Sequence, residues 1–148
     1  MGIDWQTFAH DADVGVRGCG DTLAEAFAGA ALALTATVCD PDTVRAQDAV
    51  DIECALPATA GTLGTAGLEL LLVDWLNALV FEMATRRMLF SRFEVSLHES
   101  GLRARAWGEP VAMDRHQPAA EPKGASFCEL QVERDSNGRW LAQCVVDV

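Results

Sequence analysis

One segment, residues 68–86, limits the folds available to this chain more than any other. Its apolar residues recur at helical spacing and cover more than one face of the helix. They are Leu68, Leu71, Leu72, Trp75, Leu76, Leu79, Val80 and Met83. A helix with so broad an apolar surface is largely buried, and Glu69, Asp74 and Asn77 make it too polar to span a membrane. We therefore expect it to lie on a sheet inside a folded domain.

A second helix is predicted over residues 22–38. Thr22 and Glu25 have the spacing of a capping box, in which each side chain bonds a free amide of the first helical turn. Leu23, Phe27, Ala30, Ala31 and Leu34 then form one apolar face. The sequence Asp40-Pro41-Asp42 closes the helix.

The rest of the chain is divided between strands and loops. Apolar alternation and turn residues predict strands at residues 50–54, 93–97, 102–106, 126–134 and 139–148, and residues 8–17 are predicted to form either one strand or a strand and a turn. Loops are predicted at residues 57–67 and 111–124, and a tight turn at 135–138. The predicted fold class is α+β, a sandwich of two helices packed on a mostly antiparallel sheet of six or seven strands. Residues 1–148 are predicted to form a single domain.

The charge balance excludes several classes of function. With 11 Lys and Arg against 22 Asp and Glu, the net charge is −11. Direct binding of RNA or of an anionic membrane through a basic face is therefore not expected. The five cysteines are scattered and form no C-x-x-C pair, which argues against a zinc ribbon or a thioredoxin-like site. Buried, reduced thiols and the lack of a basic leader at the start predict a cytoplasmic protein.

Near the start, His10-Asp11-Ala12-Asp13 is the densest polar cluster. On an uninterrupted strand, His10 and Ala12 share one face while Asp11 and Asp13 share the other. Two carboxylates about 7 Å apart on one face can meet a single cation. Solvated surface acids are the alternative, and the residues alone favour it.

Two further charged residues, Asp147 and Lys123, are candidates for a functional site. Asp147 lies in an apolar strand beside Val148, so it must be exposed, paired or bound to a cation. Their oxygens suit Ca²⁺, Mg²⁺ or Mn²⁺, although a solvated strand end explains the pattern equally well. Lys123, the single lysine, opens a strand and can contact a phosphate oxygen or pair with an acid. A plain surface charge is the stronger alternative for Lys123.

Other candidate residues are less informative. Asp114 and His116 could bind a metal, but a loop without a site is the stronger alternative, and His98 is isolated. Glu109 stands at a predicted strand end. The sequence has no G-x-S-x-G elbow and no pattern for Cys–His catalysis.

Read together, these residues resemble the archease family across nearly the whole chain. The matching segments are His10-Asp11-Ala12-Asp13-Val14-Gly15, Gly20-Asp21-Thr22-Leu23-Ala24-Glu25-Ala26-Phe27, Trp75-Leu76-Asn77, Trp107-Gly108-Glu109, His116, Lys123-Gly124-Ala125-Ser126 and Val145-Val146-Asp147-Val148. The block at the first helix and the final four residues are the most specific of these.

The resemblance implies a small acidic cytosolic protein that assists an RtcB-type RNA ligase in tRNA splicing and RNA repair. That ligase uses GTP and a divalent metal. Archeases are not enzymes; they promote guanylylation of the ligase and its multiple turnover, and they widen its nucleotide choice. A stand-alone metal-dependent phosphohydrolase and a chaperone-like scaffold module remain the alternative functions.

The resemblance also assigns residues. It implies that Asp13, Asp147 and Val148 bind a divalent metal ion, calcium, manganese or magnesium, and that Lys123 is needed for activation. The chain departs from the family pattern at Asp11, where Thr is usual, and at Ser126, where Thr is usual. The extra acid at Asp11 adds negative charge beside the predicted site. Whether Asp11, Asp114 or His116 contributes to that site is left open by the sequence.

Overall fold

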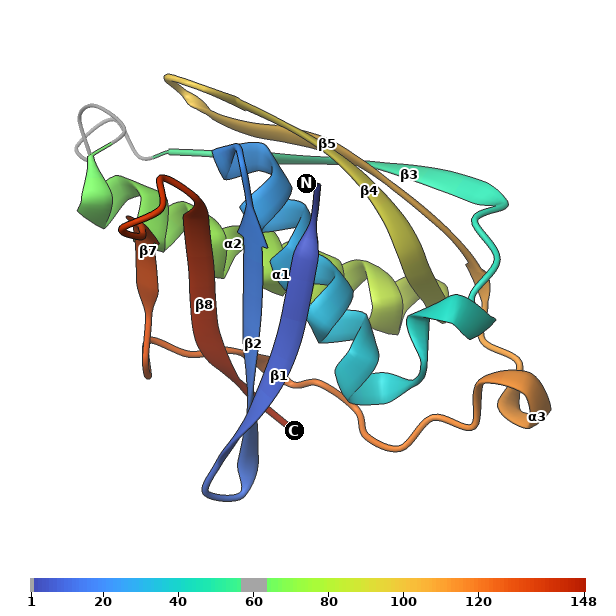
Figure 1. Ribbon diagram of the computed structural model, residues 1–148. Helices are drawn as coiled ribbons and strands as arrows, with labels where there is room; N and C mark the ends of the chain where they lie inside the picture. The colour runs from blue at the N-terminus through green and yellow to red at the C-terminus, as the bar shows by residue number, and fades with distance from the viewer. Residues whose placement is uncertain (1, 57–63) are drawn as a thin grey trace.

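Two antiparallel sheets enclose the two long helices (Figure 1). The computed structural model describes residues 2–56 and 64–148. Each long helix contacts strands of both sheets, so the core lies between the two sheets. The predicted α+β class with antiparallel strands is confirmed, and the strands are divided between two sheets instead of forming one.

The element bounds follow from the backbone pairing. The larger sheet contains β1 (Asp4–His10), β2 (Asp13–Gly20), β8 (Trp140–Asp147), β6 (Gly124–Ala125) and β7 (Gln131–Arg134). Its order is β1-β2-β8-β6, and β7 also pairs with β8. The smaller sheet has the order β3 (Asp48–Ala55), β5 (Gly101–Pro110), β4 (Met88–His98). The helices are α1 (Leu23–Val38), α2 (Thr65–Arg86), the short α3 (Met113–His116) and a 3₁₀ turn, Pro41–Thr43.

The predicted capping box begins α1. The Thr22 Oγ1 accepts a hydrogen bond from the Glu25 N–H, and the Glu25 Oε1 accepts one from the Thr22 N–H, each at 3.1 Å. The helix ends at Val38, as predicted. Ten of its 16 residues are buried, and six of those are Ala or Gly, which lets α1 approach the larger sheet closely.

The apolar helix α2 is buried as its sequence predicts, but it begins at Thr65 rather than Leu68. Trp75 is fully buried, and its indole N–H donates to the Phe27 carbonyl of α1 at 3.0 Å. The Trp75 ring also meets the Phe93 ring edge-on, with centroids 6.0 Å apart. This satisfied N–H explains how a tryptophan fits the interface between the helices. None of the helices in the described part of the chain combines the length and apolar character that a membrane crossing needs.

The strand predicted at residues 126–134 is wrong in its first half. Ser126 bonds the Val145 carbonyl through both its N–H and its Oγ, at 2.9 Å each. The Cys128 carbonyl still accepts a hydrogen bond from the Val145 N–H at 3.0 Å, the backbone then turns at Glu129, whose φ is 53°, and regular pairing with β8 resumes at Gln131. The predicted turn at Asp135 is present, with the Asp135 side chain accepting from the Asn137 N–H at 2.8 Å. Of the predicted loop at 57–67, residues 57–63 lie outside the described residues.

We predict that Gly18→Ala destabilises the protein by about 2 kcal/mol or more, because overpacking a tight contact displaces the backbone. A Cβ at Gly18 would overlap the Ala26 carbonyl oxygen and the Ala30 nitrogen of α1. Urea denaturation of both proteins measures the difference. Gly64→Ala is the matched control, because a Cβ there meets nothing within 4 Å, and its effect is expected to stay below about 1 kcal/mol. Equal stability of Gly18→Ala and the unsubstituted protein would contradict this packing.

Candidate metal centre at the end of β8

Pairing between β2 and β8 brings Asp13 to the end of the chain. The antiparallel register joins Val14 to Val146. Continuing this register by one residue puts Asp13 opposite Asp147. The Asp13 Oδ1 accepts a hydrogen bond from the Val148 N–H at 3.3 Å, so Asp13 lies beside Val148 as well. The structure therefore gathers the three residues that the resemblance assigns to a metal.

Both carboxylates belong to the side of the sheet that faces away from the helices. Val16 and Val146 belong to the core against the helices. Successive side chains of a strand alternate between the two faces. Asp13 and Asp147 each stand at an odd number of residues from these core positions, so they occupy the opposite, outer face. Asp13 is partly exposed and Asp147 is exposed, so water and ions reach both.

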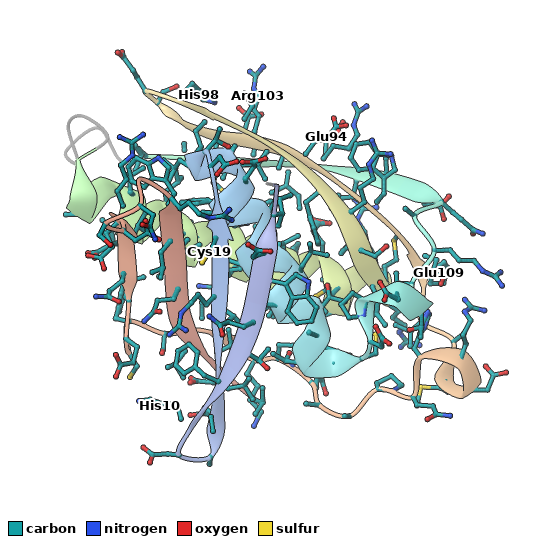
Figure 2. All side chains as sticks on the ribbon, viewed as in Figure 1. His10, Cys19, Glu94, His98, Arg103 and Glu109 are labelled. Atoms are coloured by element: carbon teal, nitrogen blue, oxygen red, sulfur yellow. The ribbon has the colours of Figure 1, made fainter. Side chains whose placement is uncertain are left out.

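Of the two possibilities for residues 8–17, the structure shows the turn, so Asp11 and Asp13 do not share one face of an uninterrupted strand. The strand reverses between them: β1 ends at His10, β2 begins at Asp13, and these two residues are direct partners. Asp11 forms the turn with a φ of 53°. Its short polar side chain tolerates this left-handed conformation, and that tolerance was the signal in the sequence for a turn. His10, labelled in Figure 2, is thus the cross-strand neighbour of Asp13.

Phe8, Arg17 and Gln143 connect β1, β2 and β8 next to Asp13, and the sequence did not single them out. Phe8 pairs with Gly15, and a Cβ at Gly15 would overlap the Phe8 ring. The glycine therefore lets the ring cover the strand two residues from Asp13. The Arg17 guanidinium lies 4.9 Å from the centroid of the same ring and donates to the Gln143 Oε1 of β8 at 2.7 Å. The Gly in the H-D-A-D-V-G motif was the available signal for this contact.

Lys123 lies on the other edge of β8. Its N–H donates to the Asp147 carbonyl at 2.8 Å, and the next residue, Gly124, pairs with Asp147. The end of β8 therefore has Asp13 on one side and Lys123 on the other. Lys123 is exposed, as a side chain that contacts a partner molecule must be.

The donor chemistry fits a hard cation. Asp13 and Asp147 offer carboxylate oxygens, and Val148 offers a main-chain oxygen. Ca²⁺, Mg²⁺ and Mn²⁺ prefer such oxygen ligands, whereas Zn²⁺ sites usually include His or Cys. Within the described residues, no three His, Cys, Asp or Glu side chains are grouped so that they could hold a metal. The set at β8 contains two such side chains and would need the oxygen of Val148.

Cysteine chemistry is not part of this centre. Burial raises the pKa of the Cys54 thiol to about 11 and that of Cys144 to about 12, so both stay protonated. All five cysteines are free. Cys128 is exposed, contrary to the expectation of buried thiols, and it lies between β6 and β7, in neither strand.

Glu109 and His116 form a separate buried cluster. Glu109 lies at the α3 side of the molecule, far from the hairpin of His10 (Figure 2). Its carboxylate accepts hydrogen bonds from the Arg45 N–H at 2.8 Å, the Arg115 guanidinium at 2.6 Å and the His116 Nε2 at 3.0 Å. The His116 Nδ1 accepts from the Ala112 N–H at 2.8 Å, which leaves the proton on Nε2.

The position of this cluster shows whether His116 and Asp114, which the sequence left open, belong to the candidate metal centre. Both ring nitrogens of His116 are engaged, and its side chain is fully buried, so it does not serve as a metal ligand here. Asp114 lies exposed on the same short helix. His98 lies near the far end of the β4–β5 hairpin, where its Nδ1 meets the Ser100 Oγ at 2.9 Å (Figure 2). None of these three residues belongs to the centre at β8.

We predict that the Glu109 cluster makes folding sensitive to acid. Burial raises the pKa of Glu109, but the hydrogen bonds from Arg45, His116 and Arg115, with the Arg115 charge, lower it to about 2. Folding therefore favours the ionised form. The stabilisation is present above the ordinary value of 4.5 and is lost as the pH falls from there towards 2.

Glu109→Gln tests this assignment. The variant should lose about 3 kcal/mol at neutral pH, because the buried donors lose their charged acceptor. Its free energy of unfolding should also change less than that of the unsubstituted protein between pH 4.5 and 2. Urea denaturation across this pH range measures both effects. Parallel pH profiles for the two proteins would contradict the role of Glu109.

Comparisons with known proteins agree with this architecture. The sequence matches the Archease protein family over residues 5–148. It is 32% identical over 148 residues to Protein archease of Pyrococcus furiosus, covering 97% of this chain and 98% of that protein. It is 37% identical over 150 residues to Protein archease of Methanopyrus kandleri, covering 99% and 100%. The solution structure of Methanobacterium thermoautotrophicum protein 1598 matches with a TM-score of 0.76 and 28% identity, covering 99% of each chain.

These matches extend over nearly the full length of the described domain, in sequence and in structure. They include β2, β8 and the residues that the two strands bring together. The chain belongs to the archease family.

Proposed function

We propose that this protein is a non-enzymatic activator of an RtcB-type RNA ligase, and that it acts in the cytoplasm in tRNA splicing and RNA repair. In this role it promotes guanylylation of the ligase and its multiple turnover, and it widens the ligase's choice of nucleotide. Membership of the archease family supports the proposal. The observation that carries it is the arrangement of Asp13 and Lys123 on the two edges of β8, next to Asp147.

In the proposed mechanism, Asp13, Asp147 and Val148 would hold a divalent cation through their oxygens. Guanylylation moves a nucleotidyl group onto a ligase side chain and releases pyrophosphate, so negative charge builds on phosphate oxygens. A divalent cation stabilises such charge. Lys123 supplies a fixed positive charge that can contact one of the same oxygens. The protein thus presents carboxylates and a cationic side chain together to the nucleotide site of its partner.

The charge of the protein suits a ligase that binds RNA. A surface that holds the RNA backbone is basic, and this chain carries a net charge of −11. Complementary fields raise the rate of encounter, and added salt weakens them. The RNA itself is then contacted by the ligase, and the activator meets RNA only indirectly.

A multiple-turnover ligation assay tests the proposal. Purified RtcB-type ligase, GTP, Mn²⁺ and an excess of RNA ends are incubated with and without this protein, and ligated product is counted per ligase. More turnovers in its presence support the activator role. Release of GMP or GDP by the protein alone would favour a stand-alone phosphohydrolase. Equal turnover in both reactions would contradict the proposal.

We predict that Lys123→Ala lowers the stimulated turnover by roughly 10²-fold, the scale on which removing a charged or hydrogen-bonding group from a developing oxyanion acts. The side chain is exposed, so the fold should persist. Arg103→Ala is the control, because Arg103 is a 72% exposed side chain on the smaller sheet, away from the end of β8 (Figure 2). Stimulation by Lys123→Ala at the unsubstituted level would remove Lys123 from the mechanism.

We predict that Asp13→Asn and Asp147→Asn each weaken binding of divalent metal by at least about tenfold, because each removes one charged oxygen ligand. Calorimetric titration with Ca²⁺, Mn²⁺ and Mg²⁺ measures the affinity without any ligase. Asp114→Asn is the matched control, an exposed acid at the α3 side. The absence of metal binding by the unsubstituted protein would instead favour a scaffold without metal chemistry.

A further inference from the structure

The strand next to Lys123 is too short to hold its own position. β6 contains only Gly124 and Ala125, which pair with Asp147 and Val146 of β8. The N–H groups of Lys123 and Ser126, on either side, also donate to carbonyls of β8. A ladder of this length opens locally unless another element secures it.

Helix α2 supplies that second attachment through Asn77. The Asn77 Oδ1 accepts a hydrogen bond from the Ala125 N–H at 2.8 Å. Gly124 leaves room for this approach, since a Cβ there would lie 3.2 Å from the same oxygen. Asn77 projects from a rigid position, because the residues directly before it, Trp75 and Leu76, are fully buried.

We propose that Asn77 is a positioning residue for Lys123. β6 is held from one side by β8 and from the other by α2, and Lys123 leads directly into it. Loss of the Asn77 oxygen leaves the Ala125 N–H without this acceptor and lets the segment carrying Lys123 shift against Asp13 and Asp147. This inference rests on the proposed role of Lys123 in activation.

Three substitutions separate the hydrogen bond from other effects. Asn77→Leu keeps the number and branching of the side-chain heavy atoms and suits a helix, but it offers no acceptor. Asn77→Asp keeps an oxygen at the same place and serves as the rescuing variant. Asn77→Ala repeats the loss of the acceptor with a smaller side chain. Asn77 is exposed, so all three proteins should unfold at nearly the same urea concentration.

The activity test is a titration of each variant into the ligation assay. We expect Asn77→Leu and Asn77→Ala to lower the maximal stimulation about five- to tenfold, with an unchanged half-saturating concentration, and Asn77→Asp to restore it. This split indicates that the ligase is still bound but activated less well. An unchanged maximum, a change in the half-saturating concentration alone, or failure of Asn77→Asp to rescue would overturn the positioning role.

A second measurement does not depend on the ligase. Amide hydrogen exchange followed by NMR should be at least about fivefold faster at Ala125 and Lys123 in Asn77→Leu, and close to the unsubstituted rate in Asn77→Asp. Unchanged exchange in Asn77→Leu overturns the inference. If the unsubstituted protein fails to stimulate any ligase, the proposed function fails, whereas faster exchange still supports the attachment of the Lys123 segment by Asn77.

Discussion

Backbone hydrogen bonding along β8 is the contact on which the rest of the candidate centre depends. This strand pairs with β2 on one edge and with β6 and β7 on the other. Residues that are more than a hundred positions apart in the sequence, Asp13 and Val148, therefore become neighbours. The side chains contribute the charges, but the ladder sets where those charges stand. Phe8, Arg17 and Gln143 then fasten the outer face beside them.

Much of the fold could be predicted because its determinants are local. The reciprocal bonds of Thr22 and Glu25 need only four consecutive residues, and the structure shows both. The broad apolar surface of α2 already required burial on more than one side, which two enclosing sheets provide. The alternation at Val50, Ile52 and Cys54 gave the buried face of β3 for the same reason. Placing Asp13, Asp147 and Lys123 in one centre needed the family resemblance, because no local pattern links them.

The sequence was least informative where contacts between distant residues determine the local backbone conformation or the side-chain partner. Asp11 continues an alternating pattern, so the sequence left open whether the strand continues or the chain reverses there, and Asp11 adopts the positive φ of the reversal. Ser126 resembles the start of a strand, yet its hydroxyl and N–H both bond the Val145 carbonyl, and the backbone turns at Glu129 before regular pairing resumes. The pairing of Glu109 with His116 joins a strand end to a short helix, and no pattern in the neighbouring sequence indicates it. Residue patterns cannot reveal such partners without the three-dimensional arrangement.

The segment between Val111 and Lys123 is fixed to its surroundings at both ends and near its middle. Val111 bonds the Arg87 carbonyl, His116 is locked to Glu109, Ala119 bonds the Val38 carbonyl, and Lys123 bonds Asp147. Because this segment is attached at four points, the number of its residues is constrained more tightly than their identity. An added residue must bulge into solvent, whereas a deleted one must pull Lys123 back from β8 or break an attachment.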